Sequence, residues 1–316
     1  MLTSYKTIFF SVVAYIFAEA GVGPSPGQIK NLVTFGDSYT DVAHIDRGTP
    51  WPIYASSFAK VKLFPFAKSG ATCSNNITYR PFPSLFESQL PAYFKTTSEK
   101  GPGFLNPEQT IYTLWIGTND VGVNALLTGS DKASLVDVTT CMTNWVERLY
   151  DSGARNFLFQ NMIPLETVPL YAPGSYPNRY WNRERNTTEW NVFMAELVLS
   201  GNALTKLMLQ ALTPTLPGAH IGIFDSHSLF ADMFAHPELY LNGTAPLNVT
   251  GAVDSCVYPL NGHTKRCTTV TGDDRDSFLW YVFDELHPSE QANRIVAREI
   301  AQVIVGQKNK WTTWLI

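Results

Sequence analysis

The chain has 316 residues and a formal net charge of −4, and 13% of its residues are aromatic. A chain of this length can bury a large core without bound metals or added cross-links, as an α/β domain commonly does. Because it carries no basic block, nucleic acid and anionic membrane surfaces are excluded as expected partners.

Residues 1–20 have the pattern of a secretory signal peptide. Lys6 precedes an apolar stretch over 8–17, and Ala18-Glu19-Ala20 follows as a cleavage site. The stretch is too short to span a bilayer comfortably, which argues against the alternative of an uncleaved anchor. Since no later segment has the length and apolarity of a membrane helix, we expect no membrane partner. We expect a secreted, extracellular protein with a single domain over 21–316.

Predicted strands and helices alternate along the rest of the chain. Short apolar runs predict buried strands at 31–35, 111–116, 156–162 and 220–224. Apolar spacing of the helical type predicts helices at 51–60, 134–152, 190–212 and 289–304, the last with Pro288 in its first turn. The polar segment 240–277 indicates a long excursion, not a second domain.

This alternation predicts an α/β fold, a three-layer α/β/α sandwich with a central, mostly parallel sheet. Functional residues of such folds lie where the strands end. Gly36-Asp37-Ser38 follows the first predicted strand, and Gly117-Thr118-Asn119-Asp120 follows the second. We therefore expect both segments on one rim of the sheet.

Four cysteines fit an oxidising compartment and allow three pairings. Cys256 and Cys267 flank Gly262 in a polar loop, so we expect them to pair locally, which leaves Cys73 with Cys141. The alternative is free buried thiols. The Asn-x-Ser/Thr pattern of glycan acceptors occurs at Asn76, Asn186, Asn242 and Asn248.

The sequence contains a serine, a histidine and an aspartate, the three residue types of serine-based hydrolysis, at positions where turns are predicted. A serine hydroxyl becomes a useful nucleophile only when a base takes its proton, and the base must be held in the right tautomer. Ser38 offers the hydroxyl, and Asp284 and His287 offer an orienting carboxylate and a base on one short turn. Either motif alone could instead be an ordinary turn or a helix cap.

Two further segments offer hydrogen-bond donors for the oxyanion of an ester's tetrahedral intermediate. Gly70 lies about thirty residues after Ser38 and offers a backbone N–H, and Asn119 offers a side-chain amide. The Ser38 N–H is a third donor. The alternative for each segment is an ordinary loop.

Taken in order, these four segments resemble the GDSL/SGNH hydrolase superfamily, whose fold is flavodoxin-like. The resemblance implies that Ser38 is the nucleophile, that Gly70 and Asn119 are oxyanion donors, and that His287 is the base oriented by Asp284. Tyr39 replaces the leucine of the family's name, which should affect packing or the acyl pocket and not the chemistry.

A narrower resemblance is to secreted fungal acetylesterases of carbohydrate esterase family sixteen. It rests on residues 35–41, 69–75 and 115–120. The resemblance implies an acetylated oligosaccharide or small ester as substrate, and hence aromatic walls around the sugar. The tryptophans considered for such walls are Trp51, Trp115, Trp181 and Trp280, of which Trp115 ends a buried strand and is expected in the core.

Two other functions are weighed against this one. A lipase or phospholipase of the same superfamily would need an apolar acyl channel, and a catalytically inactive carbohydrate-binding protein would not need all five chemical residues. We expect a monomer and no cofactor. We expect no metal either, because the remaining histidines, His44, His220, His227, His236 and His263, are scattered.

Overall fold

The computed structural model of the chain describes residues 22–43, 48–129, 132–280 and 285–315. The predicted signal peptide at 1–20, His44 and Asp284 lie outside the described residues.

A six-stranded sheet with the order β10-β5-β4-β3-β1-β2 forms the centre of the fold. Its strands are β1 (Asn31–Gly36), β2 (Lys62–Pro65), β3 (Thr110–Trp115), β4 (Asn156–Gln160), β5 (His220–Phe224) and β10 (Thr312–Trp314). Strands β1 to β5 pair in parallel, and β10 runs antiparallel to β5. Strands β3 and β4 are buried along their whole length, as a parallel sheet covered on both faces requires.

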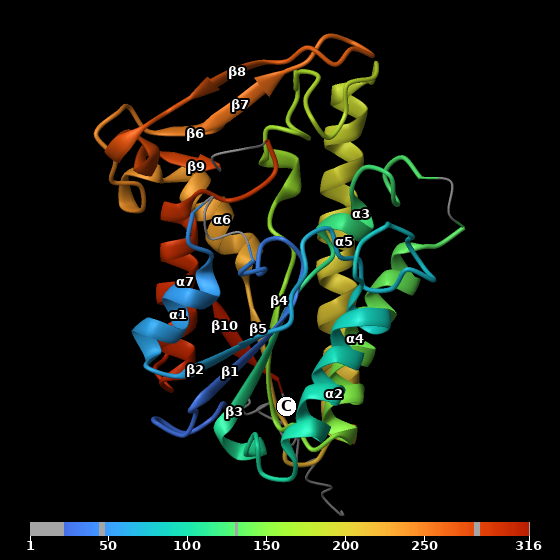
Figure 1. Cartoon of the computed structure of the whole chain (residues 1–316), viewed down its shortest axis with the longest axis vertical. Helices are drawn as coiled ribbons and strands as arrows, with labels where there is room; N and C mark the ends of the chain where they lie inside the picture. Colours follow the sequence, from blue (N-terminus) through green and yellow to red (C-terminus); the bar gives the residue numbers. More distant parts are fainter. Residues whose placement is uncertain (1–21, 44–47, 130–131, 281–284, 316) are drawn as a thin grey trace, which may run out of the picture.

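Helices cover both faces of this sheet (Figure 1). On one side lie α1 (Trp51–Ala59), α6 (Ser226–Ala235) and α7 (Glu290–Ile304), and on the other lie α2 (Leu90–Lys100) and α4 (Leu135–Asp151). Side chains alternate between the faces, so Leu32 packs in one hydrophobic cluster and Val33 in the other. The predicted three-layer α/β/α sandwich is confirmed.

Polar caps begin two of the predicted helices near their expected positions. Ser134 and Asp137 form a reciprocal capping box at the start of α4. Ser289 is the N-cap of α7 and accepts a hydrogen bond from the Ala292 N–H. Pro288 therefore precedes the cap, and the prediction that it lies in the first turn of this helix is wrong.

The expectation that no segment after the signal peptide has the length and apolarity of a membrane helix is wrong. Helix α5 (Thr187–Leu212), extended to Thr215, is long and apolar enough to cross a membrane. One face packs against α4 and the core, with Met194 and Val198 fully buried, whereas apolar side chains such as Leu199 and Leu207 are exposed on the rest of the helix. A core helix passes the same test as a membrane helix.

The segment 240–277 forms the expected excursion. Strands β7 (Asp254–Val257) and β8 (Arg266–Thr269) pair as an antiparallel hairpin, and β6 (Asn248–Ala252) pairs with β9 (Phe278–Trp280). The Cys256–Cys267 disulfide joins the two strands of the hairpin, and Cys73 is bonded to Cys141. Short helical turns complete the fold: α3 (Thr118–Val121), η2 (Leu85–Gln89), η3 (Pro107–Gln109), η4 (Leu165–Thr167), η5 (Thr213–Thr215), η6 (Pro237–Leu239) and η7 (Gly272–Ser277).

Candidate active site

Ser38 lies in a tight turn immediately after β1. The Asp37 carboxylate holds this turn by accepting a hydrogen bond from the Tyr39 N–H at 3.0 Å. Gly36 precedes it with φ of 139°, and a Cβ atom there would lie 2.0 Å from the Trp115 carbonyl oxygen. The close approach of β1 to β3 therefore requires glycine at this position.

Three neighbouring strands bring the predicted nucleophile and oxyanion donors together. Ser38 follows β1, Gly70 follows β2 and Asn119 follows β3, and β1 lies between β2 and β3 in the sheet. The sequence pattern does not predict β2, because this edge strand exposes Lys62 and Pro65 and lacks a continuous apolar run. It is nevertheless the strand that delivers Gly70 to the rim.

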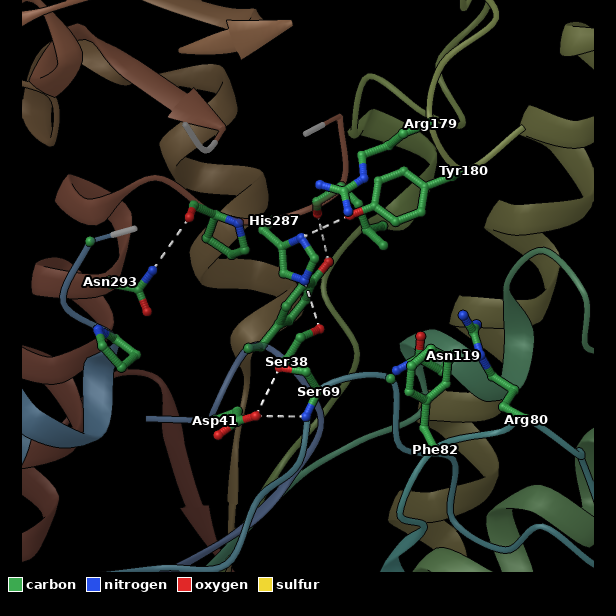
Figure 2. A pocket seen from close by; sticks show the side chains of 16 residues that line it. Ser38, Asp41, Ser69, Arg80, Phe82, Asn119, Arg179, Tyr180, His287 and Asn293 are labelled. Atoms are coloured by element: carbon green, nitrogen blue, oxygen red, sulfur yellow. Dashed lines mark hydrogen bonds between the residues drawn. The ribbon is translucent and has the colours of Figure 1, made fainter. Parts of the chain in front are cut away.

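His287 lies against Ser38 (Figure 2). Its Nε2 atom is 2.6 Å from the Ser38 Oγ atom, and its Nδ1 atom is 3.4 Å from the Tyr180 hydroxyl. The Tyr39 hydroxyl donates to the Leu286 carbonyl at 2.9 Å, and its ring contacts the imidazole edge-on. Tyr39 thus links the serine turn to the histidine segment, a role beyond the expected packing.

Glu285, two residues before His287, is also held in place by hydrogen bonds. Glu285 is fully buried, and its carbonyl accepts from the Leu170 N–H at 2.8 Å. Its carboxylate accepts from the Tyr176 hydroxyl and from the Cys256 N–H, each at 2.9 Å. The histidine segment is therefore tied to the disulfide-bonded hairpin. Asp284 lies outside the described residues, so its role as orienting carboxylate stays a prediction.

The three residues predicted to donate to the oxyanion, Ser38, Gly70 and Asn119, line one pocket. The Asn119 amide donates one hydrogen bond to the Ala71 carbonyl at 2.9 Å, which leaves its second N–H for a ligand. Within the described residues, the Ser38 and Gly70 backbone N–H groups donate to no protein acceptor. Gly70 has φ of 79°, and a Cβ atom there would lie 2.5 Å from the Phe82 ring.

Asp41 holds the loop that carries Gly70. One oxygen of its buried carboxylate accepts from both the N–H and the hydroxyl of Ser69 at 2.8 Å, and the other accepts from the Ala43 N–H at 2.9 Å. Hydrogen bonds to a charged group are among the stronger ones in proteins. Asp41 therefore restrains the position of the neighbouring Gly70 N–H.

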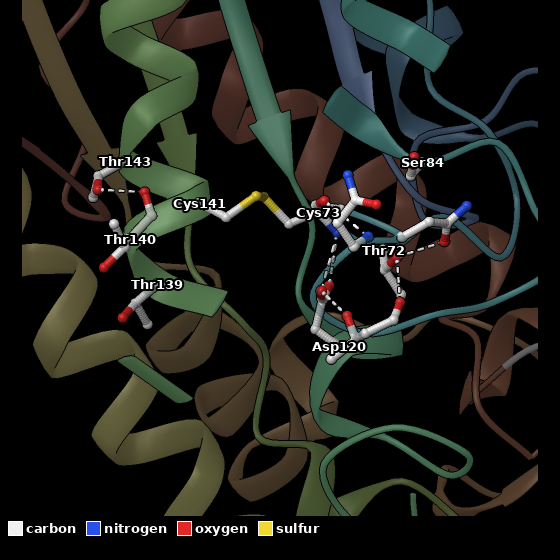
Figure 3. The surroundings of a disulfide bond; sticks show 12 residues. Thr72, Cys73, Ser84, Asp120, Thr139, Thr140, Cys141 and Thr143 are labelled. Atoms are coloured by element: carbon white, nitrogen blue, oxygen red, sulfur yellow. Dashed lines mark hydrogen bonds between the residues drawn. A yellow bond between two sulfur atoms is a disulfide. The ribbon is translucent and has the colours of Figure 1, made fainter. Parts of the chain in front are cut away.

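Asp120 holds the other side of the same loop (Figure 3). Its buried carboxylate accepts from the Cys73 N–H at 3.0 Å and from the Thr78 hydroxyl at 2.7 Å. The Cys73–Cys141 disulfide then joins the loop to α4. The loop is thus fixed to the turn after β3 and to a helix of the outer layer.

Two buried carboxyl groups lie beneath the rim. Burial raises the pKa of Asp37 to about 7 and that of Asp120 to about 6. The negative charge of Asp120 raises the pKa of Asp37 further, whereas the His287 charge lowers it. Near neutral pH, full ionisation of both Asp37 and Asp120 is therefore unfavourable.

The pocket has a volume of about 260 Å³, and its aromatic walls differ from those expected. Trp51, Trp115 and Trp280 are buried in the core, and Trp181 packs edge-on against Trp190 and does not line the pocket. The predicted tryptophan walls are therefore wrong for Trp51, Trp181 and Trp280, whereas the core position expected for Trp115 is confirmed. Among the described residues, the phenylalanine and tyrosine side chains that line the pocket are Tyr39, Phe82 and Tyr180.

Sequence reasoning missed several side chains of this pocket, namely Asp41, Arg80, Arg179 and Tyr180. Asp41 stands three residues after Ser38, and this spacing within the first motif is the one signal that could have found it. The two arginines and Tyr180 lie in loops without a recognisable motif, and the fold alone brings them to the serine.

The remaining predicted residues lie away from the pocket. The side chains of Asn76, Asn186 and Asn242 are exposed, and Asn248 is half-buried in β6. No group of three His, Cys, Asp or Glu side chains suited to a metal ion occurs in the described part of the chain.

Known proteins resemble this chain over most of its length. Residues 32–300 match the family model of GDSL-like lipase/acylhydrolases. An acetylesterase of Hypocrea jecorina is 30% identical, over 92% of this chain and 93% of its own length. An acetylesterase of Thermothelomyces thermophilus is 25% identical, over 88% of this chain and 89% of its own length.

A solved structure of an acetylxylan esterase from Geobacillus stearothermophilus, a catalytic mutant, also matches. The two share 14% identity with a TM-score of 0.45, over 92% of this chain and 98% of that one. The family match and the 30% identity carry the assignment. This chain belongs to the GDSL-like lipase/acylhydrolase family, the GDSL/SGNH hydrolases, and is a carboxylic ester hydrolase.

Proposed function

We propose that the protein is a serine esterase that removes acetyl groups from acetylated xylo-oligosaccharides or related plant carbohydrates. The observation that carries the proposal is the 2.6 Å contact between Ser38 Oγ and His287 Nε2 at the floor of a small pocket. Two relatives matched along most of the chain are named acetylesterases, which supports acetyl as the acyl group.

In the first step, His287 Nε2 takes the Ser38 proton while Ser38 Oγ attacks the acetyl carbonyl carbon. The carbonyl oxygen becomes an oxyanion that accepts hydrogen bonds from the Ser38 N–H, the Gly70 N–H and the Asn119 amide. The C–O bond to the sugar then breaks, and the protonated His287 gives its proton to the departing sugar oxygen. Acetate is left as an ester of Ser38.

In the second step, water replaces the sugar. His287 takes a proton from this water, whose oxygen attacks the acetyl carbonyl carbon, and the same donors hold the new oxyanion. The bond to Ser38 Oγ breaks, Ser38 recovers its proton from His287, and acetic acid leaves. Asp284 orients the imidazole in both steps, a role proposed from the Asp-x-x-His motif.

The lining of the pocket favours a short acyl group. Polar and charged side chains, among them Asp41, Arg80 and Asn119, interrupt its apolar surface beside Ser38. A fatty acyl chain would need a longer apolar channel, as in the lipase or phospholipase alternative.

The test compares acyl chain lengths on wild type and Ser38→Ala. We expect wild type to release acetate from acetylated xylo-oligosaccharides. Along a series of aryl esters from acetate to octanoate, its kcat/KM should fall. The Ser38→Ala variant should lose at least about a thousandfold in kcat. Ser57→Ala, an exposed serine of α1, is the matched control and should keep wild-type activity. Faster hydrolysis of octanoate than of acetate would favour the lipase alternative.

We also propose that the protein acts outside the cell as a monomer with one domain over 21–316. Support for export comes from the signal-peptide pattern at 1–20, from two disulfides and from four Asn-x-Ser/Thr sites. Removal of 1–20 and glycans on Asn76, Asn186, Asn242 or Asn248 are the corresponding expectations, and peptide mapping of the exported protein tests them.

A further inference from the structure

Two arginines line the pocket beside the proposed catalytic groups. Arg80 lies next to Asn119 and Phe82, and Arg179 lies next to Tyr180 (Figure 2). Among the described residues, no carboxylate forms a salt bridge with either guanidinium group. Two positive charges thus face the pocket of a protein whose net charge is −4.

The described carboxylates near the pocket are bound by hydrogen-bond donors other than the two arginines: Asp37 accepts from the Tyr39 N–H, and Asp120 accepts from the Cys73 N–H and the Thr78 hydroxyl. Asp41 is the one carboxylate among the described lining residues, and its three hydrogen bonds from Ser69 and Ala43 hold it within the wall. Asp37 and Asp120 feel the charge of Arg80 but lie fully buried beneath the rim. A negatively charged ligand group could therefore pair with either guanidinium group without displacing a salt bridge among the described residues.

Each arginine is held beside an aromatic ring. The Arg80 guanidinium lies over the Phe82 ring at 5.6 Å from its centroid, and that of Arg179 lies over the Tyr180 ring at 5.4 Å. Aromatic faces suit the apolar face of a sugar, and the planar guanidinium group suits a carboxylate. The combination fits a sugar that carries an acid group.

Building on the acetylesterase function proposed above, we propose that the pocket selects acetylated oligosaccharides that carry a uronic acid, whose carboxylate is bound by Arg80 and Arg179. The acid group belongs to the sugar part of the ester, because the rings that flank both arginines would contact the sugar. The steps of hydrolysis are the same for neutral and acidic substrates. The acidic substrate differs in that its carboxylate is also bound by the two arginines.

The experiment measures kcat/KM for an acetylated xylo-oligosaccharide with a glucuronic acid side group and for the same compound after reduction of its carboxyl group. Wild type should prefer the acidic compound by about tenfold in dilute buffer, and added salt should weaken this preference. Arg80→Gln and Arg179→Gln should each lower the ratio about threefold, and the double variant should bring it near one.

Arg183→Gln is the matched control. Arg183 lies in the same loop as Arg179 and stacks on the Trp181 ring at 4.7 Å, but it does not line the pocket. It should leave the ratio unchanged. The ratio is an internal measure within each variant, so a general loss of activity or stability does not imitate the expected result.

Three outcomes would overturn the inference in distinguishable ways. Equal rates for the acidic and reduced compounds in wild type would refute uronic acid selection while leaving the acetylesterase function intact. A preference for 4-nitrophenyl hemisuccinate over the acetate, with equal rates for the two sugars, would place the carboxylate on the acyl side. Release of acetate from neither sugar, with 4-nitrophenyl acetate hydrolysed, would overturn both the carbohydrate substrate and the inference.

Discussion

Replacing Asp41 with asparagine tests whether a carboxylate beside the serine turn sets the oxyanion donors. Asp41 accepts two hydrogen bonds from Ser69 at 2.8 Å and one from the Ala43 N–H at 2.9 Å. An asparagine has one oxygen, so its NH₂ group must face at least one of these N–H donors. The variant loses at least one charge-assisted hydrogen bond, which is worth about 1.5–3 kcal/mol of stability.

The same change should slow catalysis through Gly70. Ser69 precedes Gly70, and a shift of the Gly70 N–H weakens a contact that forms in the transition state. We expect kcat for 4-nitrophenyl acetate to fall by about ten- to a hundredfold with a small change in KM. Kinetics and urea denaturation of Asp41→Asn measure the two effects on one preparation.

Asp137 supplies a matched control for this prediction. At the start of α4 its carboxylate binds the N–H and the hydroxyl of Ser134 at 2.8 and 2.7 Å, the same pattern as Asp41 with Ser69. Asp137→Asn should therefore cost some stability and leave kcat unchanged. If Asp41→Asn loses stability but keeps kcat within twofold of wild type, the proposed link from Asp41 to the oxyanion donors is refuted.

Three further predictions follow from the same site. Asn119→Ala removes one oxyanion donor and should lower kcat by about 10²–10³ while KM changes little in steady-state assays; a kcat near wild type would remove Asn119 from the chemistry. Burial raises the pKa of Asp37 to about 7, against about 3.9 for an unfolded aspartate, so its contribution to the free energy of unfolding falls as pH rises from about 4 to 7. Asp37→Asn should flatten this decline in urea denaturation at pH 5 and pH 8, and an unchanged slope would contradict the assignment. Replacing both Cys73 and Cys141 with serine removes the disulfide that closes a loop of 68 residues, and by the loop-entropy relation should lower the free energy of unfolding by about 4 kcal/mol. A loss below about 1 kcal/mol would show that the disulfide adds little.

Much of the fold could be predicted from local patterns. Strands β1, β3, β4 and β5 are short apolar runs with buried side chains, and α4 and α7 carry clear polar caps. These elements are enough to place Ser38 and Asn119 on one rim of a parallel sheet. Strand β2 could not be predicted because an edge strand with exposed ends lacks the apolar signal.

The walls of the site could not be predicted in the same way. The sequence shows that Trp51 and Trp280 are large and apolar, but their burial depends on how α1, α7 and β9 pack together. Arg80 and Arg179 are about a hundred residues apart and reach the same pocket because two loops converge above the sheet. Such convergence is a property of the tertiary structure and leaves no local pattern.

The role of Ser38 as nucleophile is tested most directly by identifying the residue that becomes covalently modified during hydrolysis. Inactivation with a fluorophosphonate, followed by peptide mapping with mass spectrometry, reports which hydroxyl His287 activates. We expect one label per chain, on Ser38, with complete loss of esterase activity. Complete inactivation with the label on another residue, or full activity with Ser38 labelled, would contradict this role.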